Sequence, residues 1–216
     1  TDGGKATGVK TSEGDIYAGT VVLETGFRTS ALLAEHGVEL PITPVRHAIA
    51  VVERTPDFGG IHPVVSDRIV QAYYRPEADS LTLLGEHDPL EGKVDPDVED
   101  IKTPDLDEQV RLVERYAARF PGQEAASITR GYTGVYDCTP DFQPAFGSVK
   151  AVDGLFMAAG FSGHGFKLSP GIGKIMSDLV MDGSTDMIDI HPFRVERFAE
   201  GDPLTAGEGY DNRSLA

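Results

Sequence analysis

The sequence predicts a mixed fold, of the α+β / α/β kind, in which an antiparallel sheet accompanies a second group of strands and helices. Three features support this class. Short strand-like runs fill the first half of the chain, an amphipathic helix pattern follows them, and a glycine-rich turn joins an apolar strand to a helix near the C-terminus. With 216 residues, of which 40% are hydrophobic, the chain can form one large core or two small ones.

The charge and the cysteine content limit the partners and the compartment. The sequence has 35 acidic and 19 basic residues, for a net charge of −16. Nonspecific binding to a phosphate backbone needs cations that displace counterions, so we expect no nucleic-acid partner. No apolar run approaches the ~20 residues of a membrane span, and a single cysteine, Cys138, cannot form an internal disulfide. We therefore expect a cytoplasmic protein without a membrane span, and we predict no metal site.

The N-terminal region begins in the middle of a strand pattern. Residues 6–11 and 15–18 flank a turn and predict a hairpin, and residues 20–24 predict a buried strand that ends before Gly26. Such a strand needs sheet neighbours that the sequence does not obviously supply. Because the first residue is Thr1, we expect the chain to be a fragment.

A short helix is predicted next. Thr29 or Ser30 is expected to cap it, and Gly37 is expected to stop it after Glu35.

The middle of the chain predicts an antiparallel sheet with one helix on its face. Acidic residues and prolines predict a long surface loop over 86–107, and Asp105 or Asp107 is expected to cap a helix that runs to Phe120. The strands that we expect in this sheet are 44–53, 62–66, 69–74 and 80–85. The face of the helix that we expect to be apolar carries Leu106, Val110, Val113, Ala117 and Phe120.

The C-terminal third predicts strands and one last helix. The strands are expected at 126–136, 145–149 and 154–159, and the helix is expected from Ser169-Pro170 to Met181, before a polar tail.

The turn before this last helix carries the strongest chemical signal. Gly160, Gly163 and Gly165 let the backbone approach a flat or charged ligand, and the helix that follows offers main-chain N–H groups and a partial positive charge. The pattern therefore indicates an anion or cofactor site, or else a tight crossover whose glycines serve packing. It is not a dinucleotide fingerprint, because Leu168 stands where the third glycine of G-x-G-x-x-G belongs.

Two blocks of residues resemble a known family. Tyr136-Asp137-Cys138-Thr139-Pro140-Asp141, with Pro144 and Gly147 after it, and the run 158–167 (AAGFSGHGFK) occur in order. They resemble the C-terminal part of the D-amino-acid oxidase-like flavoproteins, in the branch of sarcosine oxidase, dimethylglycine dehydrogenase and glycine oxidase. Weaker similarity extends back through 85–87, 73–76 and 41–46 to the strand at 21–26.

The resemblance implies a domain organisation around FAD. Residues 1–43 would be a segment of a Rossmann-like FAD domain, residues 44–128 the antiparallel substrate (cap) domain, residues 129–200 the C-terminal FAD-domain segment, and residues 201–216 a flexible tail. The N-terminal βαβ unit that holds the FAD pyrophosphate in this family would be missing. Gly134 stands where the covalently flavinylated cysteine of monomeric sarcosine oxidase is placed, which implies noncovalent FAD.

The resemblance also implies the site residues. Lys167 matches a lysine that pairs with the substrate carboxylate, and His87 matches a pocket histidine; from the residues alone, either could be an ordinary surface side chain. The substrate-binding candidates are Tyr74, Arg75, Tyr132 and Arg46, of which the neighbours Tyr74 and Arg75 cannot both point into one pocket. The residues that would contact the cofactor are Gly26, Gly160, Phe161, Ser162, Gly163, His164, Gly165, Phe166 and Lys167.

Three functions remain open at this point. The first is FAD-dependent oxidation of a small amino acid or N-methylated amine by hydride transfer, in a homo- or hetero-oligomer or a monomer. The second is a noncatalytic subunit or binding module, which Glu24 and Thr25 favour because the family has small residues there. The third is a flavoenzyme that acts on a 2-hydroxy acid.

Overall fold

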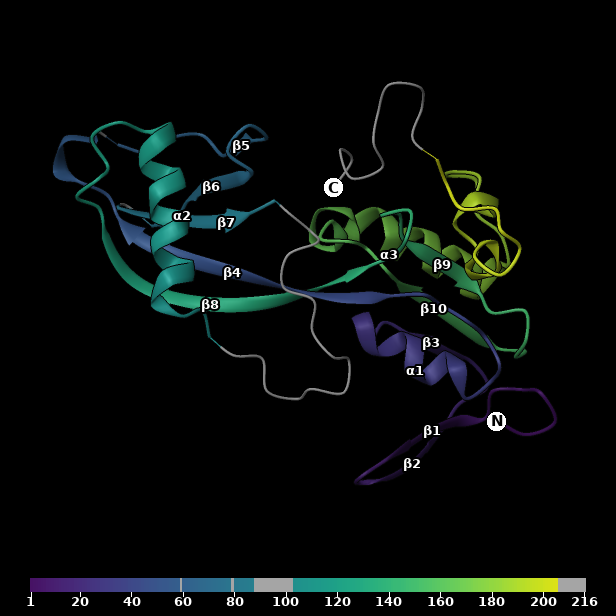
Figure 1. Ribbon diagram of the computed structural model, residues 1–216. Coiled ribbons are helices and arrows are strands. Elements are labelled where there is room, and N and C mark those ends of the chain that lie inside the picture. Colours follow the sequence, from purple (N-terminus) through teal and green to yellow (C-terminus); the bar gives the residue numbers. More distant parts are fainter. Residues whose placement is uncertain (59, 79, 88–102, 206–216) are drawn as a thin grey trace. The chain divides into compact units, whose positions relative to one another are not determined.

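The computed structural model describes residues 1–58, 60–78, 80–87 and 103–205. The chain divides into two compact units (Figure 1). The first contains Thr1–Pro44 and Tyr136–Ala216, and the second contains Val45–Val135. Most of the loop predicted over 86–107 and of the tail predicted over 201–216 lies outside the described residues.

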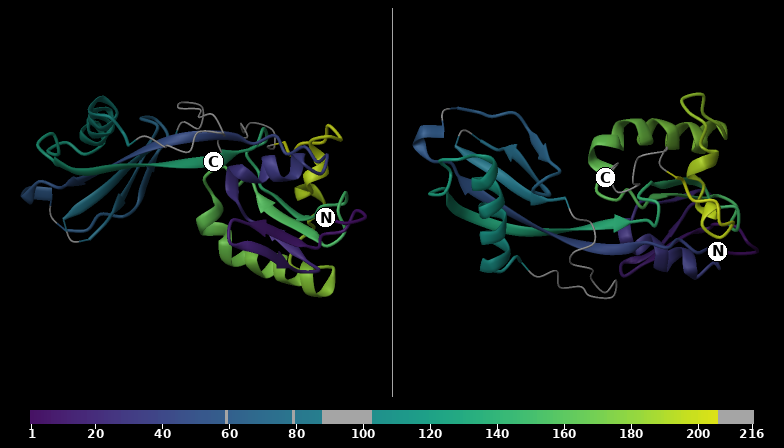
Figure 2. Two further views of the ribbon diagram at one scale, coloured as in Figure 1. Left: turned by 90° about the horizontal axis from the view of Figure 1, so that it is seen from below. Right: turned by 45° about the horizontal axis from the view of Figure 1, so that its top comes forward.

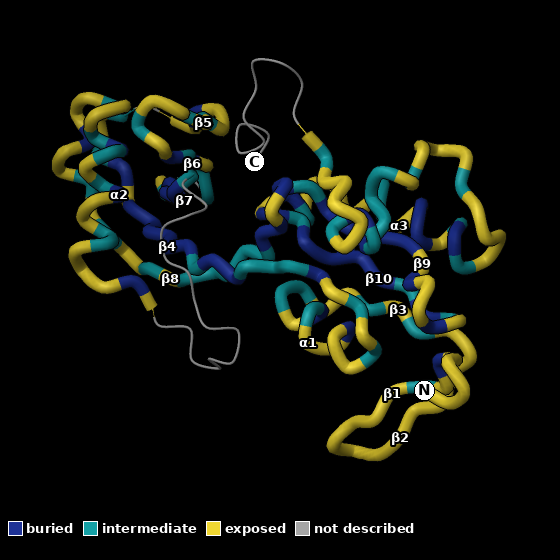
Figure 3. Tube along the Cα trace, turned by 45° about the vertical axis from the view of Figure 1, so that its right-hand side comes forward, coloured by how far each residue is buried: buried dark blue, intermediate teal, exposed yellow. Residues whose placement is uncertain are grey.

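The first unit begins with the predicted hairpin. Strands β1 (Gly8–Thr11) and β2 (Gly14–Tyr17) pair antiparallel, with Val9 opposite Ile16. Most of the hairpin is exposed (Figure 3).

A three-stranded sheet forms the centre of the first unit. Strand β10 (Leu155–Ala159) pairs parallel with β3 (Val21–Leu23) and antiparallel with β9 (Ala145–Ser148). Side chains of β10 alternate between two cores, as a strand requires. One core contains Leu33 of α1 (Thr29–Ala34), and the other contains Ile175 and Met176 of α3 (Gly165–Asp182). These helices therefore lie on opposite faces of the sheet (Figure 2, left).

The predicted cap of the short helix is wrong. A 3₁₀ turn, η1 (Gly26–Arg28), leads directly into α1, so Arg28 occupies the N-cap position without a side-chain hydrogen bond. Thr29 is the first helical residue, with Oγ1 2.9 Å from Oγ1 of Thr25. Ser30 donates its hydroxyl to the carbonyl of Leu40 at 2.6 Å.

The second unit contains the predicted antiparallel sheet, in the spatial order β5-β6-β7-β4-β8. The pairs β5–β6, β6–β7 and β7–β4 are antiparallel. The strands are β4 (Thr43–Glu53), β5 (Val65–Asp67), β6 (Ala72–Pro76), β7 (Leu81–Glu86) and β8 (Ser127–Cys138), with the 3₁₀ turn η2 (Pro56–Phe58) after β4.

Two strands of this sheet start later than predicted. Asp67 delays the second of them, β6, because its Oδ1 accepts the N–H groups of Ile69 and Val70 at 2.9 and 3.2 Å. This local hydrogen bonding turns the chain where a strand was predicted. Ile69 is consequently exposed, and β6 begins only at Ala72.

Helix α2 (Leu106–Arg119) covers one face of the sheet, as predicted (Figure 1). Its buried residues are Leu112 and Tyr116, which pack with Ala50 and Leu84 of the strands. The predicted apolar face is confirmed in part, because Val113 and Phe120 also pack against this core, whereas Leu106 is exposed.

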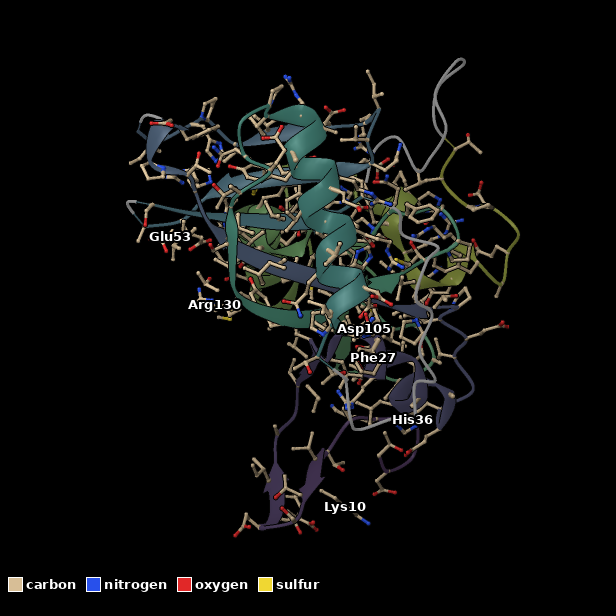
Figure 4. The ribbon with its side chains drawn as sticks, turned by 60° about the vertical axis from the view of Figure 1, so that its left-hand side comes forward. Lys10, Phe27, His36, Glu53, Asp105 and Arg130 are labelled. Atoms are coloured by element: carbon tan, nitrogen blue, oxygen red, sulfur yellow. The ribbon has the colours of Figure 1, made fainter. Side chains whose placement is uncertain are left out.

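A capping box begins α2. The Asp105 side chain accepts the N–H of Glu108 at 2.9 Å, and Oε2 of Glu108 accepts the N–H of Asp105 at 2.9 Å. Figure 4 labels Asp105 at this end of the helix. The cap predicted from the sequence is thus confirmed at Asp105.

Replacing the cap is expected to destabilise the protein. Asp105→Ala should lower the free energy of unfolding by ~1 kcal/mol, because the Glu108 N–H loses its acceptor. Asp105→Ser is the matched control, since serine caps about as well as aspartate. Urea unfolding of the two variants measures the difference, and equal losses would show that the cap contributes nothing.

The C-terminal segment returns to the first unit. Two 3₁₀ turns, η3 (His191–Phe193) and η4 (Val195–Arg197), follow α3, and Val195 and Arg197 are buried. Within the described ranges, no helix is both long and apolar enough to cross a membrane.

Candidate functional site

Residues 160–164, the glycine turn, connect β10 to α3. Its backbone has positive φ angles at three positions: +76° at Gly160, +51° at Ser162 and +91° at Gly163. Glycine adopts such angles without steric cost, whereas Ser162 does so at a cost that its surroundings must offset.

The glycines of the turn are also required by close packing. A Cβ atom at Gly160 would lie 2.4 Å from Cγ2 of Thr139, and one at Gly163 would lie 2.9 Å from the ring of Tyr136. The residues that press on the turn therefore come from the end of β8 and the segment after it.

Helix α3 begins at Gly165 and not at the predicted Ser169. Pro170 lies inside the helix and lacks the N–H that would bond to the carbonyl of Phe166. Ser169 compensates, because its hydroxyl donates to that carbonyl at 2.9 Å. Lys167 is thus in the first turn of the helix, whereas the sequence analysis placed it in the preceding loop.

The start of α3 is open. The Phe166 side chain is 96% exposed, and Gly163 and Lys167 are also exposed. The first N–H groups of a helix have no intrahelical acceptor, and His164 at the N-cap gives no side-chain cap. The first turn contains no acidic residue, so the partial positive charge of the helix end is not offset locally.

The other predicted cofactor residues of this region are less accessible. Ser162 and His164 are buried, and Phe161 and Gly165 are half-buried. A Cβ at Gly165 would lie 3.3 Å from Phe161, so these two residues pack together.

Asp137 holds the glycine turn from the side of β8. Its Oδ2 accepts the N–H of Gly160 at 2.7 Å, and its main-chain carbonyl accepts the N–H of Ser162 at 3.3 Å. Burial raises the pKa of the Asp137 carboxyl, while N–H donors of the turn oppose that rise. The sequence analysis did not select this residue, and the only signal was a carboxylate inside the Tyr136–Asp141 block.

Asp141, in the segment after β8, forms a buried ion pair with Arg197. Asp141 and Arg197 are 1% and 0% exposed, and two parallel hydrogen bonds of 2.9 and 3.0 Å join them. Burial alone would raise the pKa of Asp141, but the guanidinium of Arg197 outweighs it and lowers that pKa.

Thr139 connects this pair to the glycine turn. Its hydroxyl donates to Asp141 at 3.0 Å, and its N–H donates to the Ser162 hydroxyl at 3.2 Å.

In the second unit, Tyr74 belongs to the core. It is 0% exposed, it packs against Tyr116 and Phe120, and its hydroxyl donates to the carbonyl of Arg115 at 2.9 Å. Burial raises the pKa of Tyr74 to about 12. These surroundings do not support the substrate-binding role predicted for Tyr74.

The arginine candidates are engaged in ion pairs. Arg46 binds both carboxylate oxygens of Glu108, at 2.5 and 2.9 Å, which raises the pKa of Arg46 and lowers that of Glu108. Arg75 is exposed and pairs with Glu77. Tyr132 on β8 is 43% exposed.

His87 is half-buried at the end of β7, in a small polar cluster. Its Nε2 lies 2.8 Å from the hydroxyl of Ser66, and its ring centroid lies 5.3 Å from that of Tyr73. Tyr73 in turn covers Gly85, where a Cβ would lie 2.2 Å from the ring. Pairing of β5, β6 and β7 brings these residues together, and the sequence analysis missed Ser66.

Two other predictions concern the strand near the N-terminus and the cysteine. Gly26 begins η1, separated by two residues from the end of β3, with a φ of +56°. Glu24 is exposed, so its carboxylate bears no burial cost. Cys138 is 5% exposed, and burial raises the pKa of its thiol to about 12, so this residue packs in the core.

Comparison with solved structures defines the class of protein. L-proline dehydrogenase from P. horikoshii matches 94% of this chain and 53% of its own, with a TM-score of 0.82 and 25% identity. Glycine oxidase from Geobacillus kaustophilus matches 87% of this chain and 48% of its own, with a TM-score of 0.72 and 27% identity. The chain therefore shares the fold of about half of each of these two enzymes.

The sequence comparisons give the family. Residues 1–179 match the family described as DAO, FAD dependent oxidoreductase, and the chain belongs to this family. FAD-dependent oxidoreductase domain-containing protein 1 of Xenopus laevis is 29% identical over 83% of this chain and 36% of its own length. Glycine oxidase of Pseudomonas putida is 28% identical over 89% of this chain and 50% of its own length.

The predicted resemblance is therefore confirmed. Dimethylglycine dehydrogenase of Rattus norvegicus and monomeric sarcosine oxidase of Bacillus sp. match as well, at 28% and 26% identity. The chain spans about a quarter to a half of the length of the curated relatives named above.

Proposed function

We propose that the chain is part of a flavoenzyme that binds FAD noncovalently and oxidises a small amino acid or an N-methylated amine. The bound FAD would accept the hydride from the carbon next to the amino group, and water would hydrolyse the resulting imine. The proposal rests on the exposed, uncapped start of α3, which follows the glycine turn. The chain also belongs to an FAD-dependent family. The names of the related glycine and sarcosine oxidases favour a small amino acid.

The residues of the glycine turn and of α3 fit the flavin end of FAD. The main-chain N–H groups of Gly163 and of 165–167, together with the positive helix end, suit a ring that gains negative charge on reduction. The 216 residues contain no G-x-G-x-x-G sequence for the pyrophosphate. The proposal for this chain is therefore limited to the flavin end.

The thiol chemistry supports the proposal of noncovalent binding. Gly134 replaces the cysteine that the resemblance would require for a covalent bond. The thiol of Cys138 is buried with a raised pKa, so it is not a reactive thiolate.

Lys167 is proposed to bind the carboxylate of an amino acid substrate. A cation in the first turn of a helix opposes the helix dipole, which favours anions there. Among the described residues, Lys167 forms no ion pair that would offset this cost. An anionic substrate beside the first turn would offset the charge of Lys167, while the N–H groups remain for the flavin. We also retain the assignment of 1–43 and 129–200 to the FAD domain and of 44–128 to substrate binding.

The proposed function predicts flavin reduction by amines. The complete polypeptide that carries these residues should purify with FAD and lose its flavin absorbance when mixed anaerobically with a small amino acid or N-methylated amine. The 216 residues alone serve as the comparison and should not retain FAD, because the pyrophosphate loop is absent from them. A complete protein without FAD, or one reduced by 2-hydroxy acids and by none of the amines, would contradict the proposal.

A further inference from the structure

We propose that Asp137 is a positioning residue for the flavin, because its carboxylate accepts the hydrogen bond that fixes the glycine turn in its ligand-facing conformation. This inference rests on the proposed function and concerns how the same site is held in place. Asp137 itself does not need to touch the cofactor.

The hydrogen bonds of Asp137 reach two points of the turn. Its side chain accepts from Gly160 at 2.7 Å, and its main chain accepts from Ser162 at 3.3 Å. The preceding residue, Tyr136, packs its ring under Gly163. One short segment at the end of β8 therefore contacts the beginning, the middle and the end of the glycine turn.

The turn needs such support because its backbone is strained. Ser162 has a φ of +51°, a conformation that costs a non-glycine residue of order 1–3 kcal/mol unless its surroundings enforce it. The Ser162 hydroxyl accepts from the N–H of Thr139 and donates to the carbonyl of Gly160, at 3.2 and 3.3 Å. The Asp137 carboxylate adds the one charged acceptor, and charge-assisted hydrogen bonds are about twice as strong as neutral ones.

Burying the Asp137 carboxylate costs free energy that a purely structural role would not require. It is partly desolvated, as the raised pKa indicates, and no lysine or arginine of the described segments forms an ion pair with it. Main-chain N–H groups of the turn are its stabilising partners. We infer from this cost that the Asp137 carboxylate serves to fix the conformation of the turn and not to fill space in the core.

A loosened turn would change ligand binding directly. The N–H groups of Gly163 and of the first helical residues face the flavin in the proposed function, and their directions depend on the φ angles of the turn. Without the Asp137 acceptor, the turn can adopt other conformations, and FAD binding must then supply the free energy that orders it.

The test measures FAD affinity and requires no turnover. In the complete polypeptide, Asp137→Ala should raise the FAD dissociation constant at least tenfold, whereas Asp137→Asn should stay within about threefold, because its amide oxygen can still accept from Gly160. Apoprotein titrated with FAD and followed by flavin fluorescence gives both constants. Leu155→Ala is the control for stability: Leu155 is a buried core residue at the far end of β10, and its loss should lower the melting temperature but leave FAD affinity unchanged.

The possible results separate this inference from the proposed function. A weakened FAD affinity in Asp137→Ala together with a nearly wild-type FAD affinity in Asp137→Asn supports the positioning role. Wild-type affinity in Asp137→Ala, or an equal loss in both Asp137 variants, overturns it while the proposed function stands. A wild-type protein that binds no FAD overturns both.

Discussion

Replacing Arg197 with alanine is expected to lower the free energy of unfolding by about 3–5 kcal/mol, the largest stability effect that the structure indicates. The side chain is fully buried, and its partner Asp141 is 1% exposed. Removing the guanidinium leaves an uncompensated carboxylate in the core, which costs more than the ion pair itself contributes.

Additional contacts of the guanidinium increase the expected effect. Arg197 donates to the carbonyl of Gln143 at 2.9 Å and to those of Phe193 and Arg194 at 3.3 and 3.2 Å. Asp141 also accepts the N–H of Leu204 at 3.0 Å, so the pair fastens the C-terminal segment to the region before β9.

Chemical unfolding of the complete polypeptide measures the Arg197 effect. Lys5→Ala is the matched control within the same unit, because Lys5 and Asp153 form an exposed ion pair with a 3.6 Å separation. Exposed pairs contribute ~0–1 kcal/mol, so this variant should unfold almost like the wild type. If Arg197→Ala were no more destabilised than Lys5→Ala, the buried pair would not be a main source of stability.

The sequence predicted those parts of the fold that depend on local signals. Asp105 precedes Glu108 by three residues, a spacing typical of a capping box, and the cap was found there. The glycine turn was likewise visible, because Gly160, Gly163 and Gly165 follow an apolar strand.

The parts that could not be predicted depend on distant or compensating contacts. Asp141 and Arg197 are 56 positions apart, and nothing near either residue indicates the other. The start of α3 was placed too late because proline usually marks a first turn, whereas Ser169 makes Pro170 tolerable inside this helix.

The local structure around the candidate residues was predicted better at the glycine turn than in the antiparallel sheet. Residues near the glycine turn are consecutive, so one motif specifies them together. In the sheet, burial separates candidates that look alike in sequence: Tyr74 enters the core while its neighbour Arg75 is exposed. The alternation of side chains along β6 distinguishes such residues, and the turn at Asp67 makes this strand begin later than predicted.

Lys167→Ala is expected to raise the Michaelis constant for an amino acid substrate by about 10- to 100-fold, and to change that for an uncharged amine by much less. A hydrogen bond to a charged group contributes ~1.5–3 kcal/mol, and 1.4 kcal/mol corresponds to a factor of ten. The carboxylate of the amino acid would lose this partner, whereas an amine without a carboxylate never had it. Steady-state kinetics with a matched pair, an amino acid and the amine that lacks its carboxyl group, separate the two cases.

Lys174→Ala provides the control, since Lys174 lies two turns further along α3 and pairs with Asp178 on the surface. Removing it changes the net charge by the same amount, so any effect of overall charge on an anionic substrate appears in both variants. A selective effect in Lys167→Ala alone would therefore come from direct contact with the carboxylate. Equal increases for the amino acid and the amine in Lys167→Ala would instead remove Lys167 from carboxylate binding.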